Sequence, residues 1–188
     1  MIYKIRSSVT DHDPGKDAAY RTHLRKYDKK NDTALWRYFY WDFFHDGVIE
    51  NIKFSPDLSE ASFEIWCPNI KRYVTEQDYE YVNAKFICTF QSLKWFVLES
   101  DEDESATSGG KAYFLSSEIN TLDDQMKKYS VPEDEYEMSS LIIELDSGYM
   151  SLVFWSMRVE AVEPLAFSLM LSDKQHEVPI FMKEDESS

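Results

Sequence analysis

Two stretches decide the fold: ASFEIWC at residues 61–67 and AKFICTF at residues 84–90. In both, an apolar residue stands at every second position. Side chains of a β-strand point alternately to its two faces, so this spacing predicts two strands that each bury one face. Trp66 lies on the face opposite Phe63 and Ile65. The pattern therefore predicts that Trp66 is either covered by another element or exposed as an anchor for a partner.

Similar spacing continues on both sides of these stretches. Residues 48–54 precede a Pro-Asp-Leu-Ser turn, and residues 141–145 lead through an Asp-Ser-Gly turn into a long alternating run at residues 149–159. Turn residues between alternating runs predict hairpins. The odd positions from Tyr149 to Val159 are predicted to share one face. A further strand is predicted over residues 165–171.

The N-terminal part of the chain has helical rather than strand periodicity. Tyr20, Leu24 and Tyr27 recur at the spacing of a narrow apolar helix stripe, and residues 34–43 favour a second, largely buried helix. Consecutive hairpins favour an antiparallel meander, because parallel strands need long crossovers. The predicted fold class is α+β and mainly β: a rolled or sandwiched antiparallel sheet with an N-terminal helical layer.

The domain organisation follows from this pattern. Residues 1–188 are predicted to form a single domain, in which an N-terminal helical segment (1–46) packs on a β-rich body (47–182) and the tail (183–188) frays. The two cysteines, Cys67 and Cys88, are too few for a disulfide scaffold and are predicted to be small core side chains. The N-terminus lacks the apolar core of a signal peptide, and no apolar run reaches the roughly 18 residues of a membrane helix. We therefore expect a cytoplasmic protein without membrane contact.

The charge of the chain restricts its partners. The formal net charge is −15, which would repel nucleic-acid phosphates, so no nucleic-acid binding is expected. Residues 1–31 carry a net charge of +4 and the remainder −19. Two interpretations are open: the basic segment packs across the acidic body, or the acidic body docks a basic protein, since complementary fields favour association.

The densest group of chemically active residue types is Phe43-Phe44-His45-Asp46-Gly47, where an aromatic segment meets the first strand. His45 and Asp46 could form an acid–base pair or half of a metal site, because imidazole titrates near neutrality and a carboxylate can orient it. The structural alternative is a turn into the strand, and it is the favoured interpretation. Together with Trp66, these two residues are the candidate ligand-binding positions.

Two acidic runs are candidate partner-binding positions. They lack the ligand spacing and the glycine of a calcium loop, so they are interpreted as solvated carboxylates. The positions are Asp101, Glu102, Asp103, Glu104, Glu133, Asp134 and Glu135. No phosphate-binding loop, nucleophile elbow or metal-ligand motif occurs in the chain. No catalytic residue, metal or cofactor is therefore predicted, and the enzyme question stays open with an inclination towards no.

A group of uncharacterised bacterial proteins, in which an F-H-D-G-x-I segment enters a β-rich fold, resembles this chain in two places. They are the stretch Trp36 to Phe54, which contains Phe44-His45-Asp46-Gly47-Val48-Ile49, and the later segment Phe86-Ile87-Cys88-Thr89-Phe90. Some small proteins of this kind are immunity-like factors that accompany secreted toxins. The resemblance implies a binding role and assigns a role to no individual residue.

The expected function is non-catalytic binding of a basic protein, as an immunity-type or regulatory factor. The alternative is a small-ligand binder or an unrecognised enzyme with an aromatic pocket near His45 and Asp46. A structural protein that pairs its edge strands is a third possibility. The oligomeric state does not follow from the sequence.

Overall fold

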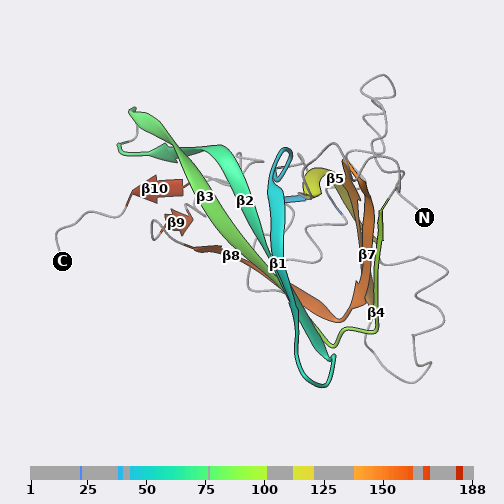
Figure 1. Ribbon diagram of the computed structural model, residues 1–188. Helices are drawn as coiled ribbons and strands as arrows, with labels where there is room; N and C mark the ends of the chain where they lie inside the picture. Colours follow the sequence, from blue (N-terminus) through green and yellow to red (C-terminus); the bar gives the residue numbers. More distant parts are fainter. Residues whose placement is uncertain are drawn as a thin grey trace.

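The computed structural model describes residues 22, 38–39, 43–75, 77–100, 112–120, 138–162, 167–169 and 181–183. Ten strands run through them (Figure 1): β1 Val48–Phe54, β2 Glu60–Tyr73, β3 Tyr79–Gln91, β4 Trp95–Ser100, β5 Ala112–Asn120, β6 Ser139–Leu145, β7 Gly148–Phe154, β8 Ser156–Val162, β9 Phe167–Leu169 and β10 Phe181–Lys183. Neighbouring strands pair antiparallel, except that β10 lies parallel to β2, with Phe181 opposite Arg72. The expected fold of mainly antiparallel β-structure is confirmed.

The expected N-terminal helical layer lies almost wholly outside the described residues. Of that segment, Thr22, Tyr38 and Phe39 have helical conformation, and a turn begins at Phe43. Of the tail that was expected to fray, Lys183 ends β10, and residues 184–188 lie outside the described part.

Strands β1 to β8 form two runs of four with the same connectivity. In the first run, β1 pairs with β2 and β2 with β3; in the second, β5 pairs with β6 and β6 with β7. The last strand of each run crosses to the other run, so that β4 pairs with β7 and β8 pairs with β3. β1 and β5 pair with each other. We call β1, β2, β3 and β8 the first half of the sheet, and β4 to β7 the second half.

The two crossings lie side by side and bend the sheet. Ser92 has a positive φ of 51° between β3 and β4, and Trp155 separates β7 from β8. The ladder continues through the bend, because Lys94 N donates to Val153 O at 2.8 Å and Trp155 N donates to Gln91 O at 3.0 Å. Figure 1 shows the two halves diverging upward from this region.

Both halves contribute side chains to one core. Phe63, Phe86 and Phe90 from the first half belong to the same buried cluster as Leu141 and Leu152 from the second. The alternating apolar positions of residues 61–67 and 84–90 are all buried, as the sequence predicts, and Cys67 and Cys88 are among them.

The prediction that the odd positions from residue 149 to 159 share one face is wrong, because they lie on the outer face in β7 and on the core face in β8. The core positions of β7 are Met150, Leu152 and Phe154, whereas those of β8 are Met157 and Val159. The core positions change from even to odd residue numbers at Trp155, because the chain leaves one half of the sheet there and enters the other. Alternation within a single strand cannot indicate such a bend.

Two asparagines curve the first half. Asn51 and Asn69 have φ values of 52° and 57°, and each lies where the pairing register shifts by one residue. Asparagine tolerates this left-handed conformation better than most residues. A residue inserted into one strand bends it and increases its twist. These bulges therefore bend β1 and β2.

Candidate interaction surface

The turn that carries His45 and Asp46 is held by the backbone. Gly47 N donates to Phe44 O at 2.8 Å, and Asp46 N donates to Phe114 O at 2.9 Å. Asp46 has a positive φ of 63°. His45 Nδ1 lies 3.1 Å from Asp46 Oδ1, with 56% and 72% of the two side chains exposed. The pair therefore faces solvent at the end of β1.

Close packing beneath the turn explains the glycine that follows it. A Cβ on Gly47 would lie 2.7 Å from Ile65 Cγ2 and 2.8 Å from Phe44 O. The ring of Phe44 is fully buried and contacts other rings, including Phe86 at 5.5 Å and Phe114 at 5.7 Å between centroids. The aromatic residues before His45 thus fill the core, which favours the structural interpretation of the turn.

Trp66, the third candidate, lies on the outer face of β2 and is 37% exposed. It stands opposite Val48 on one side and Lys85 on the other, and Lys85 Nζ lies 5.4 Å from the centre of the Trp66 ring. Val48, the residue opposite Trp66 on β1, is two residues after Asp46. The structure thus places Trp66 near the turn, with the ammonium group of Lys85 from the same chain beside its ring.

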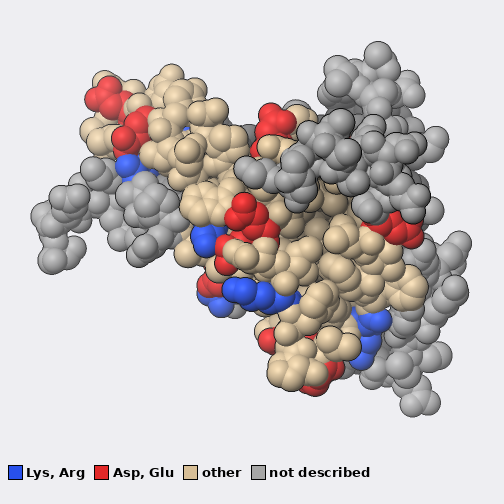
Figure 2. Space-filling view, in the orientation of Figure 1, with Lys and Arg blue, Asp and Glu red and all other residues tan. Residues whose placement is uncertain are grey.

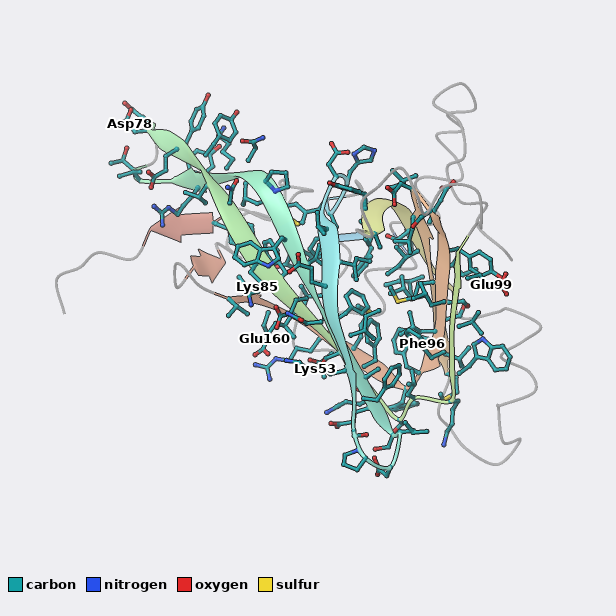
Figure 3. All side chains as sticks on the ribbon, viewed as in Figure 1. Lys53, Asp78, Lys85, Phe96, Glu99 and Glu160 are labelled. Carbon is teal, nitrogen blue, oxygen red and sulfur yellow. The ribbon has the colours of Figure 1, made fainter. Side chains whose placement is uncertain are left out.

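Glu64 forms ion pairs with two lysines, one of which is the Lys85 that lies beside Trp66. Its carboxylate accepts hydrogen bonds from Lys85 Nζ at 2.7 Å and Asn51 Nδ2 at 2.9 Å, and Lys53 Nζ lies 3.9 Å away. The hydrogen bond from Lys85 is the main cause that lowers the pKa of Glu64, and that from Asn51 adds to it. Figure 3 shows Lys53 and Lys85 on this face of the sheet.

The first half of the sheet neutralises its own charges. Its strands contain five cationic residues and five glutamates. Besides Lys53 and Lys85, Arg72 pairs with Glu80, and Arg158 Nη2 lies 2.5 Å from Glu160 Oε1. The mixture of basic and acidic side chains is visible in Figure 2. Little unpaired positive charge is left on this half.

The fifth cation lies on the arm formed by the far ends of β2 and β3. Lys71 Nζ is 3.9 Å from the ring centre of Tyr79 and 4.7 Å from that of Tyr73. Tyr79 also contacts Tyr81 edge to face, at 5.6 Å between centroids. A hydrogen bond with Tyr73 raises the pKa of Lys71. The ammonium group is thus already held by aromatic faces of its own chain.

The second half differs in charge. The strands β4, β5, β6 and β7 contain Glu99, Glu118 and Glu144 and no lysine or arginine. Tyr149 stands opposite Glu99 on β4 and opposite Glu144 on β6, so that the three residues form one row across three strands. Tyr149 is 40% exposed. A hydrogen bond to Glu99 raises the pKa of the Tyr149 phenol.

The cysteines have no suitable environment for catalysis. Burial raises the pKa of Cys67 to about 12, and it raises the pKa of Cys88 still further. The thiolate is the reactive form, so both thiols are unreactive at neutral pH. Cys67 stands opposite Ala84, and Cys88 opposite Phe63, so the two cysteines are not cross-strand neighbours. Within the described ranges, no group of His, Cys, Asp and Glu side chains is arranged to hold a metal ion.

The acidic runs predicted to bind a partner, at residues 101–104 and 133–135, lie outside the described residues. Sequence reasoning missed Glu99 and Tyr149, which are far apart in the chain and meet only through strand pairing. One signal was present: the four strand segments of the second half lack any basic residue.

Comparison of this chain with family models, with curated proteins and with solved structures finds no match. In the part of the chain that the structure describes, no helix is long and apolar enough to cross a membrane.

Proposed function

We propose that this protein is a non-catalytic module that binds a basic protein, as an immunity-type or regulatory factor in the cytoplasm. The observation that supports it is the difference between the two halves of the sheet. The cations in the strands of the first half are engaged by partners within the chain, whereas the strands of the second half contain carboxylates and no cation. Of these carboxylates, Glu99 is exposed, and its negative charge can attract a positively charged partner.

Exposed aromatic side chains support protein binding rather than repulsion alone. Trp66, Tyr79, Tyr81, Trp95 and Tyr149 each keep more than a third of their surface exposed. Tryptophan and tyrosine are enriched among the residues that dominate binding energy at interfaces. We include in this proposal that the sheet is rolled or sandwiched, because such a form would present one face of its strands outward to a partner.

The experiment is affinity capture with the full chain at low salt, followed by elution in steps of rising salt. A column bearing an unrelated protein of equal net charge removes generic binders. Each basic protein that is retained only by this chain is then purified and titrated against it by calorimetry. We expect one partner with defined stoichiometry and an affinity that falls as salt rises, because screening weakens charge pairing. Affinities that are insensitive to salt, or the absence of any selective partner, would contradict the proposal.

A further inference from the structure

Glu99 and Tyr149 of this row have the chemistry of a cation-binding site on a protein surface. Residues directly opposite each other on paired strands have Cβ atoms about 5 Å apart, and the Glu99 carboxylate is close enough to Tyr149 to hydrogen-bond with its phenol. Glu99 is exposed and, in Figure 3, points away from the body of the sheet beside β4. An aromatic ring attracts a cation over its face, and a carboxylate accepts hydrogen bonds from it.

The chemistry of the row favours arginine over lysine. The guanidinium group is planar, stacks on aromatic faces and donates several hydrogen bonds in a fixed fork. It can therefore lie over the ring of Tyr149 and donate to the carboxylate of Glu99 at the same time. The ammonium group of lysine is a more strongly hydrated point charge without a planar face to stack. A preference for arginine over lysine would distinguish a specific binding site from general electrostatic attraction.

The same face continues beyond the row. Val97 and Trp95 follow Glu99 at alternate positions of β4 and stand opposite Ser151 and Val153 of β7. Trp95 is 40% exposed. From Glu99 to Trp95 this face extends about 13 Å, at roughly 3.3 Å per strand residue. That length suits several residues of an extended or helical partner segment.

We propose that the outer face of the second half, from Trp95 to Tyr149, docks the basic partner and that an arginine of the partner stacks on Tyr149 beside Glu99. This inference rests on the proposed function and adds to it the surface and the residue type that is recognised. The four strands of this half contain glutamates and no lysine or arginine, so their charge is opposite in sign to that of a basic partner.

The test uses the full chain and two defined probes, octa-arginine and octa-lysine peptides, which carry the same side-chain charge. Affinities are measured by calorimetry at low salt, and contact positions by amide chemical shifts of the isotope-labelled protein. The test variants are Tyr149→Ala and Glu99→Gln. Matched controls are Tyr81→Ala and Glu60→Gln, a more exposed tyrosine and an exposed glutamate on the first half.

We expect octa-arginine to bind more tightly than octa-lysine and to shift amides of β4, β6 and β7. Tyr149→Ala should weaken octa-arginine binding by about three- to fivefold and remove the preference for arginine, whereas Glu99→Gln should weaken it by about two- to threefold. The controls should leave the preference unchanged, and amide spectra of all variants verify that they fold.

Two other outcomes separate the two proposals. If octa-arginine binds elsewhere, with its preference intact in Tyr149→Ala, the docking surface is wrong while binding of a basic partner stands. If neither peptide binds at low salt, both the docking surface and the basic partner are rejected.

Discussion

The backbone amide of Trp155 donates a 3.0 Å hydrogen bond to the carbonyl oxygen of Gln91, at the point where both strands leave one half of the sheet and enter the other. The amide of Lys94 donates to Val153 in the same region. Together these bonds make β3 with β4, and β7 with β8, two continuous paired strands that pass through both halves. The two halves also share one core. We therefore expect them to unfold in a single transition.

Lys94→Pro tests this coupling. Proline lacks the amide hydrogen that Lys94 donates to Val153, so a bond at the bend is lost. The expected loss is about 1–3 kcal/mol of unfolding free energy, measured by urea denaturation. Lys94→Ala keeps the amide and is the matched control, with an effect below about 0.5 kcal/mol. Tryptophan fluorescence and circular dichroism should report the same midpoint, and separate midpoints would show that the halves unfold independently.

Gly47→Ala should be strongly destabilising. The added Cβ would meet Ile65 Cγ2 at 2.7 Å and the carbonyl oxygen of Phe44 at 2.8 Å, so the core or the turn must shift. Overpacking of this kind costs about 1–3 kcal/mol, to be measured by thermal and urea unfolding. His45→Ala is the comparison at the same turn. Its exposed contact with Asp46 contributes little, so near-wild-type stability is expected, and a large loss there would mean that His45 has a structural role not visible in its contacts.

Leu58→Gly should stabilise the protein. Leu58 has a positive φ of 59° in the turn between β1 and β2, and 64% of its surface is exposed. Relief of the left-handed strain, about 1–2 kcal/mol, exceeds the entropic cost of a glycine, about 0.4–1 kcal/mol. The expected net gain is about 0.5–1 kcal/mol, read from the urea midpoint. Leu58→Ala keeps the strain and should give no gain. A loss of stability in Leu58→Gly would indicate that the leucine side chain makes a stabilising contact.

Asp57 should contribute to the acid sensitivity of the protein. Hydrogen bonds from Ser55 Oγ and from Ser59 lower its pKa from 3.8 to about 2. Because the folded-state pKa is depressed, the stabilising effect is complete above the unfolded pKa. It is lost as the pH falls from about 4 to about 2.

Thermal unfolding between about pH 6 and pH 2 tests this effect. Asp57→Asn should be less stable than wild type at the upper end, and the difference should shrink as the carboxyl of the wild type is protonated. Asp78→Asn, at the turn between β2 and β3, is the control. A difference that stays constant over the whole range would show that the carboxylate charge of Asp57 is not what matters.

The thiols of Cys67 and Cys88 should be unreactive in the folded protein. Both are buried, and burial raises the pKa of each thiol, so almost no thiolate is present at neutral pH. Labelling with a thiol-reactive chromophore should therefore be slow in buffer and become fast across the urea transition. Fast labelling of either cysteine without denaturant would reveal local opening of β2 or β3.

The sequence by itself indicated most of the strands, but not β5 or β10, and it indicated which faces of β2 and β3 are buried. Alternation at residues 61–67 and 84–90 is a local property, because strand geometry sends successive side chains to opposite faces. It also indicated the turn at Asp46 and Gly47 and placed Trp66 on the face opposite Phe63 and Ile65, but it left open whether Trp66 is covered or exposed.

Only the tertiary structure decided where the strands bend and which charges meet. The parity change at Trp155 depends on β3, β4 and β7 being paired around it, and no periodicity within residues 149–159 encodes that pairing. Tyr149 acquires its glutamate neighbours in the same way, since Glu99 and Glu144 reach it from two different strands. Periodicity is read along one strand, whereas a surface is made across several, and for this reason the proposed docking face could not be found before the pairing was known.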